Sequence, residues 1–163
     1  IGCILLSTIS ADFIAKPLVE RWRPSSDPLI KYAVDVVDDY RPGKYGFFSA
    51  HAANTFSLAL YFSLWVKNRL FSFAMISWSL LNCYSRIYLG AHYPSDVVVG
   101  LLVGAVIAVL FYLLSRKLFF KISSNFNYVS TQYSATGYSV TDIDMVLTVI
   151  GFLYILIIII PLL

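Results

Sequence analysis

The stretch SRIYLGAHYPSDVVVGLLVGAVIAVLFYLL, residues 85–114, decides the fold. Its second part, residues 97–114, carries no charged side chain and has the length of a membrane-spanning helix, about 17 to 25 residues. Its first part places Arg86, His92 and Asp96 at the rim of that apolar segment. Because an ionisable side chain at a membrane boundary is costly unless it is paired or used, these three residues are candidates for a functional site.

Composition assigns the whole chain to the same class. Hydrophobic residues make up 59% of the 163 residues and charged residues 13%, and the mean hydropathy is +0.76. A soluble domain carries about 25% charged residues. We therefore predict an integral membrane protein of the all-α class, a polytopic transmembrane helix bundle that forms one domain over residues 1–163.

Apolar stretches set the expected number of spans. Five are visible, at residues 1–15, 52–66, 71–89, 97–114 and 145–163. The chain begins inside an apolar run and without a methionine, so we expect a preceding N-terminal segment and six spans in the full protein. The segment 123–142, rich in Ser, Tyr, Asn and Thr, is expected to be a polar loop or surface hairpin. Cys3 and Cys83 lack metal-ligand spacing and are expected to pack in the core.

The order of the spans predicts which loops share a membrane face. Residues 16–48 and 86–95 fall on one side, and residues 67–70 and 115–144 on the other. The first side has more basic residues in total, but Lys16, Arg23 and Arg86 are candidate functional residues and acidic residues balance the remainder. On the second side basic residues lie close to the span ends, so the positive-inside rule favours that side as cytoplasmic. The candidate site is then expected on the extracytoplasmic face, in a bacterial inner membrane.

Three polar clusters fall on the first side, although they are spread along the sequence. Lys16 and Arg23 follow the first apolar stretch, and Arg86 ends a later one. Together they supply three cations for phosphate oxygens. His92 can act as nucleophile or proton carrier near neutral pH. Asp96 lies one helical turn further on, where it can hold one imidazole nitrogen.

The remaining cluster precedes the stretch 52–66. Ser49 and the amides of Ala50 and His51 are expected at a helix N-terminus, where N–H groups and the helix dipole favour an anion. Pro94 suits the first turn of the helix after His92, which would fix Asp96 in that turn. These residue types predict a phosphoryl-transfer site.

The same residues resemble the motifs of the type 2 phosphatidic acid phosphatase (PAP2) superfamily, which includes lipid phosphate phosphatases and vanadium haloperoxidases. The family motifs are Lys-x6-Arg-Pro, Pro-Ser-Gly-His and Ser-Arg-x5-His-x3-Asp. Lys16, Arg23 and Pro24 meet the first in full, and Ser85 to Asp96 meet the third. The second appears as Phe48-Ser49-Ala50-His51, in which alanine retains the amide donor of the family glycine. The alanine is tolerated only if the backbone there does not need φ > 0.

The resemblance implies a role for each residue. His92 would attack phosphorus and form a phosphohistidine, oriented by Asp96, while His51 would protonate the leaving group and then activate water. The phosphate would be bound by Lys16, Arg23, Ser49, Ala50 and Arg86. No metal and no cofactor are expected, because the cationic side chains would balance the phosphate charge in place of a metal ion.

The substrate is left open by the sequence. The expected partners are a lipid phosphate and the bilayer, with no nucleic acid and no obligate protein partner. Candidate substrates are undecaprenyl pyrophosphate, phosphatidylglycerol phosphate or phosphatidic acid, and a lipid A phosphate. Their head groups are expected to be selected by the loop 24–48 and by the expected N-terminal segment. Two alternatives remain: a haloperoxidase-like enzyme that holds vanadate, and a non-catalytic transporter or scaffold with a phosphate-binding pocket. Arg21 is expected to be a snorkelling anchor, and Gly100 and Gly104 to serve close helix packing.

Overall fold

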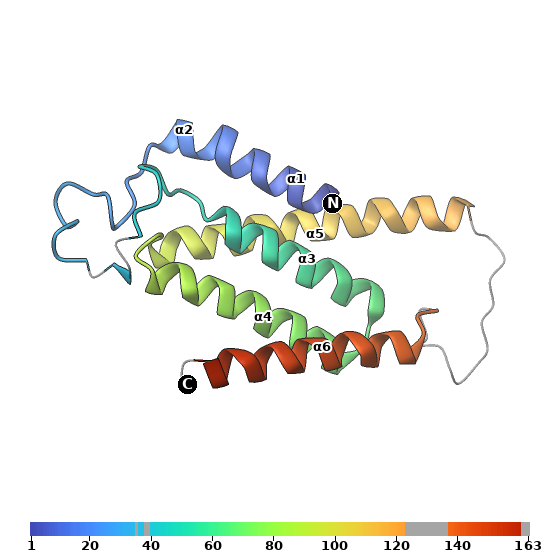
Figure 1. The fold of residues 1–163 in the computed structure, drawn as a ribbon. Helices are drawn as coiled ribbons and strands as arrows, with labels where there is room; N and C mark the ends of the chain where they lie inside the picture. The colour runs from blue at the N-terminus through green and yellow to red at the C-terminus, as the bar shows by residue number, and fades with distance from the viewer. Residues whose placement is uncertain (35, 38–39, 123–136, 161–163) are drawn as a thin grey trace.

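The computed structural model describes residues 1–34, 36–37, 40–122 and 137–160, and within these ranges the regular structure is helical (Figure 1). No β-strand occurs in this part of the chain, where Trp22 and Tyr45 form an isolated bridge. The all-α prediction is therefore confirmed. The elements are α1 (Gly2–Thr8), the π-helix η1 (Ile9–Ala15), α2 (Lys16–Val19), α3 (Ala50–Val66), α4 (Arg69–Tyr88), α5 (Pro94–Ile122) and α6 (Val140–Ile159).

Local sequence sets where the helices begin. The Ala52 amide donates to Ser49 Oγ at 3.4 Å, and the Phe71 amide donates to Asn68 Oδ1 at 3.0 Å, so these two side chains cap α3 and α4. Pro94 is the first residue of α5, where a missing N–H costs nothing, and Asp96 lies in the first turn. Both placements agree with the sequence-based prediction.

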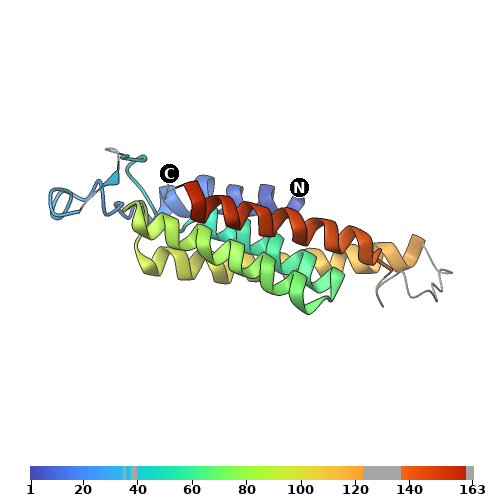
Figure 2. The same ribbon diagram turned by 60° about the horizontal axis from the view of Figure 1, so that its bottom comes forward.

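The helices lie side by side along one direction, and α3 is at the centre of the bundle (Figures 1 and 2). Helix α3 packs against α1, α4 and α5, whereas α6 contacts α4. Alanine and glycine permit the closest approach: a Cβ on Gly100 would lie 2.6 Å from the Ser49 carbonyl oxygen, and one on Gly104 would lie 2.6 Å from that of Ala53. The two glycines therefore pack α5 against α3, as expected.

Three helical segments of the described chain are long and apolar enough to cross a membrane, at residues 2–19, 94–119 and 140–159. Helices α3 and α4 lie within the same bundle. The prediction of five spans, and of six in a longer chain, is not established by these three and stays a prediction.

The bundle ends gather distant segments of sequence. The described residues of the connection 20–49 lie at the same end as the turn 89–93, where α2 and α4 finish and α3 and α5 begin (Figure 1). Residues 67–68 lie at the opposite end. Within the predicted polar segment 123–142, residues 123–136 fall outside the described residues, and α6 already begins at Val140. The prediction of a loop was therefore wrong for residues 140–142.

Candidate functional site

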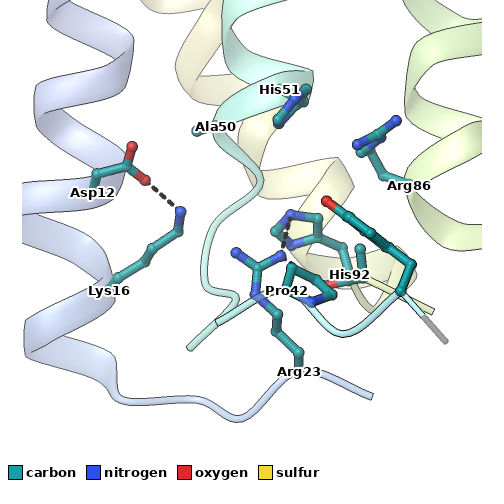
Figure 3. A pocket seen from close by; sticks show the side chains of 10 residues that line it. Asp12, Lys16, Arg23, Pro42, Ala50, His51, Arg86 and His92 are labelled. Atoms are coloured by element: carbon teal, nitrogen blue, oxygen red, sulfur yellow. Dashed lines mark hydrogen bonds and ion pairs between the residues drawn. The ribbon is translucent and has the colours of Figure 1, made fainter. Parts of the chain in front are cut away.

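A pocket opens at the end of the bundle where the three polar clusters meet (Figure 3). It encloses about 110 Å³, several times the space that one water needs. Ten residues from η1, α2, α3, α4, the connection 20–49 and the turn 89–93 line it: Asp12, Lys16, Arg23, Tyr40, Pro42, Ala50, His51, Arg86, Ala91 and His92. Six predicted site residues are among them, and Ser49 and Asp96 are not.

The cations reach the pocket from three separate elements. Lys16 begins α2, Arg86 lies in the last turn of α4, and Arg23 belongs to the connection that follows α2. The Arg23 guanidinium is held by the main chain, since it donates to the carbonyl oxygens of Tyr45 and Ala91, each at 3.1 Å. An arginine fixed in this way presents its remaining donors to the pocket with little loss of side-chain freedom.

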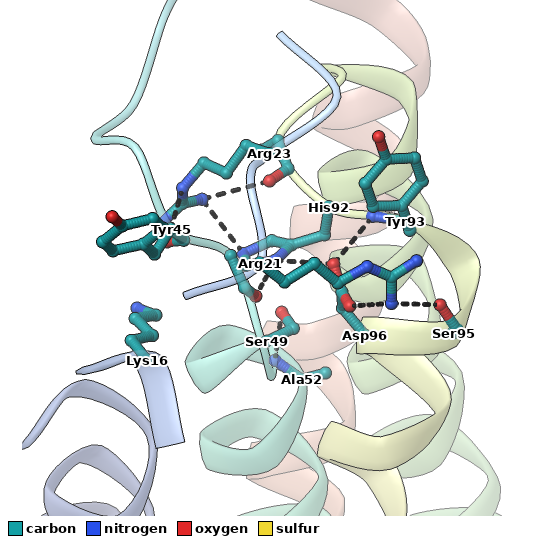
Figure 4. A network of polar contacts seen from close by, with 12 residues as sticks. Lys16, Arg21, Arg23, Tyr45, Ser49, Ala52, His92, Tyr93, Ser95 and Asp96 are labelled. Atoms are coloured by element: carbon teal, nitrogen blue, oxygen red, sulfur yellow. Dashed lines mark hydrogen bonds and ion pairs between the residues drawn. The ribbon is translucent and has the colours of Figure 1, made fainter. Parts of the chain in front are cut away.

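His92 is the most constrained side chain of the pocket. It is 3% exposed, and its Nδ1 lies 2.9 Å from the Gly46 carbonyl oxygen while its Nε2 lies 3.2 Å from Nη1 of Arg23 (Figure 4). A carbonyl oxygen can only accept and an arginine can only donate. The proton is therefore on Nδ1, and the lone pair of Nε2 is directed towards Arg23.

Protonation of His92 is opposed by its surroundings. Burial, and after it the positive charge of Arg23, lower the pKa of His92 from 6.5 to about 3. The imidazole is therefore neutral at physiological pH. A neutral ring with its Nε2 lone pair facing a cationic pocket has the form that a nucleophilic histidine requires.

Asp96 does not make the hydrogen bond expected from the sequence. Its Oδ2 lies 3.9 Å from Nδ1 of His92, too far for a hydrogen bond, and the Gly46 carbonyl takes that position instead. The fully buried carboxylate accepts from Nη1 of Arg21 at 2.8 Å and from the Tyr93 amide at 3.1 Å (Figure 4). Asp96 therefore orders the turn around His92 rather than the imidazole directly.

Ser49 and Ala50 form the start of α3 beneath the pocket. Ser49 is fully buried, its hydroxyl caps the helix, and its amide donates to the Asp96 carbonyl oxygen at 3.1 Å. Ser49 thus lies behind the pocket wall in this structure. Ala50 is the first residue of the helix and does not have a positive φ. Alanine in place of the family glycine is consequently free of backbone strain, and the Ala50 position lines the pocket.

Four contributions to the site were missed from the sequence. Asp12 forms an ion pair with Lys16 inside the pocket (Figure 3). Arg21, interpreted as a membrane anchor, binds Asp96. Gly46 positions His92. The connection 20–49 supplies Tyr40 and Pro42 as lining residues. For Arg21 a signal was present, because it lies between two motif cations.

Metal-ligating side chains do not gather around the pocket or elsewhere in the described ranges, where no group of three or more His, Cys, Asp or Glu residues could hold an ion. Cys3 and Cys83 are buried and unbridged, in agreement with a packing role. The charged groups that line the pocket are three cations and one carboxylate.

These features define a helical membrane protein with a basic pocket of phosphate size at one end of its bundle. The chain belongs to the PAP2 superfamily, whose family model matches residues 1–120. The resemblance stated from the motifs is thereby confirmed.

Individual relatives are lipid phosphatases. The chain is 40% identical over 111 residues to a lipid A 4'-phosphatase of Bacteroides thetaiotaomicron. The matched region covers 68% of this chain and 49% of that relative. It is 39% identical over 111 residues to a lipid A 4'-phosphatase of Porphyromonas gingivalis, and this match covers 66% of this chain and 47% of that relative. A sphingosine-1-phosphate phosphatase 1 of Rattus norvegicus is 33% identical over 94 residues, and this match covers 56% of this chain and 22% of that relative. The chain thus spans about half the length of the bacterial relatives. No solved structure matches it significantly.

Proposed function

We propose that this protein is a membrane phosphatase that removes a phosphate from a lipid head group. The observation that carries the proposal is the neutral His92, whose Nε2 faces a pocket with three cations and a second histidine. Lipid A 4'-phosphate is the first substrate to test, because two relatives at about 40% identity carry that activity in their names. Phosphatidic acid, phosphatidylglycerol phosphate and undecaprenyl pyrophosphate remain further candidates.

The chemistry proceeds in two displacements. His92 Nε2 attacks phosphorus, so an N–P bond forms while the bond from phosphorus to the lipid oxygen breaks. That oxygen leaves with a proton from His51, which lines the same pocket. His51 then takes a proton from water, the resulting hydroxide attacks phosphorus, and the N–P bond breaks. Phosphate departs, and both histidines regain their first state.

Charge that develops on the phosphoryl oxygens is met by Lys16, Arg23 and Arg86, with the start of α3 at Ala50 behind them. Fixed cations of this kind stabilise the transition state of phosphoryl transfer because they need no reorganisation during the reaction. We propose that these cations act in place of a metal ion. Retention of turnover in the presence of a chelator tests that part of the proposal.

We propose further that the pocket opens on the extracytoplasmic face of a bacterial inner membrane. The opposite end of the bundle carries Lys67 and Arg69, beside the start of α4, and Arg116, Lys117 and Lys121 near the end of α5. The pocket end carries more basic residues in total, but Lys16, Arg23 and Arg86 line the pocket. With those three set aside, the basic residues near span ends favour the opposite end as cytoplasmic. Labelling of a single cysteine introduced at Gly43, in a Cys3→Ala/Cys83→Ala background, by a membrane-impermeant reagent in intact cells tests the orientation.

The deciding experiment is phosphate release by the purified chain in detergent, without metal, from the four lipids. Wild type is expected to release phosphate, and His92→Ala to lose it by at least a thousandfold. Acid-labile, alkali-stable label from a ³²P substrate should be found in wild type quenched during turnover and should be absent from His92→Ala, because His92 carries the phosphoryl group. A transporter or scaffold would bind phosphate equally well with and without His92 and release none. Vanadate-dependent bromination would instead support the haloperoxidase alternative.

A further inference from the structure

A carboxylate stands among the cations of the pocket. Asp12 belongs to the π-helix η1, one turn before Lys16, and forms an ion pair with its ammonium group (Figure 3). Both side chains line the pocket, and their exposed fractions are 40% for Asp12 and 18% for Lys16. A carboxylate in a site for anions weakens anion binding by repulsion, so its presence in the pocket lining calls for an explanation.

Helix stability does not account for Asp12. An exposed pair four residues apart on a helix contributes about 0.3 to 0.5 kcal/mol, and a charge within an apolar helix at a membrane boundary costs more than that. The neighbouring residues Phe13 and Ile14 of η1 are apolar and exposed. The position of Asp12 on the pocket side points to a role in ligand selection.

The fixed charges of the pocket add up to two. Lys16, Arg23 and Arg86 contribute three positive charges and Asp12 contributes one negative charge. Neutral His92 adds none, and His51 adds one positive charge only while it carries the proton for the first displacement, so it is not counted among the fixed charges. A phosphate monoester carries about −1.5 to −2 at neutral pH, so this balance suits one phosphoryl group. A diphosphate brings a second phosphoryl group and more negative charge, which Asp12 repels.

We propose that Asp12 is a specificity-determining residue that restricts this pocket to phosphate monoesters and discriminates against diphosphates. The inference rests on the proposed function, and it narrows the candidate substrates: a lipid monophosphate is accepted and undecaprenyl pyrophosphate is disfavoured. Asp12 acts by its charge on the bound anion and by holding Lys16 at the pocket wall.

The test measures direct binding of inorganic phosphate and inorganic pyrophosphate to the full chain in metal-free detergent, by calorimetry. The quantity compared is the selectivity ratio, Kd for pyrophosphate divided by Kd for phosphate. Wild type is expected to give a ratio above one. Asp12→Asn should lower the ratio about fivefold or more, since the removed repulsion acts most on the more highly charged ligand. Asp12→Glu, which keeps the charge, should restore it.

A charge-balanced variant separates this role from a structural one. Asp12→Asn/Lys16→Met returns the pocket to two net positive charges, so its ratio should lie within about twofold of wild type although both affinities fall. Lys16→Met alone should raise the ratio. Glu20→Gln is the matched control, because it removes a carboxylate at the same end of the bundle that does not line the pocket. Its ratio should equal that of wild type.

The outcomes are distinct. A wild-type preference for pyrophosphate, or an unchanged ratio in Asp12→Asn, overturns the inference. If Asp12→Asn does not fold, Asp12→Ser takes its place: a lowered ratio supports the inference and an unchanged ratio overturns it. Lipid turnover is measured separately. Absent turnover with the expected ratios contradicts the proposed function alone, and His92-dependent turnover with unchanged ratios contradicts this inference alone.

Discussion

Nη1 of Arg21 lies 2.8 Å from Oδ1 of Asp96, a carboxylate with no solvent exposure. The same nitrogen donates to Ser95 Oγ at 2.8 Å, and the guanidinium lies 4.4 Å from the centre of the Tyr93 ring. Arg21 thus connects the segment after α2 to the turn that carries His92. The buried carboxylate obtains its counter-charge from this contact, while Nδ1 of His92 bonds to the Gly46 carbonyl oxygen.

Replacement of Arg21 by methionine is expected to lower the free energy of unfolding by about 1 to 3 kcal/mol. Breaking a buried ion pair usually costs more, but the Arg21 side chain is 38% exposed, so water offsets part of the loss. Thermal unfolding in detergent measures the change. In a double-mutant cycle, Arg21→Met should cost little in an Asp96→Asn background. Additive losses would show that the two side chains are not coupled.

The sequence predicted the helices and the residues that line the pocket better than the contacts that these residues make. Uncharged runs and motif spacing were sufficient to place the three cations and both histidines at one end of a helix bundle, because each lies next to the end of an apolar stretch or in the connection that follows one. The starts of α3 and α5 followed from Ser49 and Pro94. These are local signals, carried by the residues next to each boundary.

Contacts across the connection 20–49 could not be predicted in the same way. The Gly46 carbonyl reaches His92, and the Arg21 side chain reaches Asp96, over separations in sequence that no periodicity records. Backbone carbonyls are present at every residue, so sequence gives no sign of which one a histidine will choose. The interpretation of Arg21 as an anchor was wrong because a basic residue beside an apolar helix has the same pattern in either role.

Gly46 should be intolerant of a side chain. A Cβ at this position would lie 2.9 Å from Cγ of Arg23, 3.5 Å from Nδ1 of His92 and 3.6 Å from Oδ2 of Asp96. The clash is with Arg23, whose Nη1 lies 3.2 Å from Nε2 of His92, whereas the distance to the imidazole is an ordinary contact. We expect Gly46→Ala to displace Arg23 from its position beside the reacting nitrogen and to lower kcat at least tenfold, with a smaller change in KM, since errors of about 1 Å in a catalytic group cost that much or more. Steady-state phosphate release measures both constants.

Gly43→Ala is the matched control for this prediction. It lies in the same connection, and a Cβ there would meet nothing within 4 Å. Its kcat should remain within about twofold of wild type. Equal losses in the two variants would mean that flexibility of the connection, and not the space beside His92, requires the glycine.

His92 is expected to stay neutral far below the pH at which histidines normally titrate. The chain has two histidines, so the His51→Gln variant leaves one imidazole for ¹⁵N NMR. Its shifts should remain those of the neutral, Nδ1-protonated ring from pH 8 down to pH 5, because burial and Arg23 lower the pKa to about 3. A titration midpoint near 6.5 would contradict the proposed environment.

The same pKa makes folding dependent on pH. Between 6.5 and about 3 the unfolded chain binds a proton at His92 that the folded chain does not, so stability is lost as the pH falls through this window. One such group contributes a slope of up to about 1.4 kcal/mol per pH unit. His92→Asn should remove that part of the slope, as measured by unfolding at a series of pH values. An unchanged slope would assign the acid sensitivity to other groups.

Gly104→Ala should separate α3 from α5. The added Cβ would meet the Ala53 carbonyl oxygen at 2.6 Å and the Ala53 Cα at 3.1 Å, and backbone atoms cannot rotate away as a side chain can. Overpacking of this kind costs about 1 to 3 kcal/mol, seen as a lower unfolding temperature in detergent.

Gly151→Ala is the control, since a Cβ there on α6 would meet nothing within 4 Å and alanine is the better helix former. Because α3 carries His51 and α5 follows His92, the shift in Gly104→Ala should also reduce turnover, while Gly151→Ala keeps both stability and activity. Equal unfolding temperatures for the two variants would show that the contact between α3 and α5 is looser than the glycine spacing indicates.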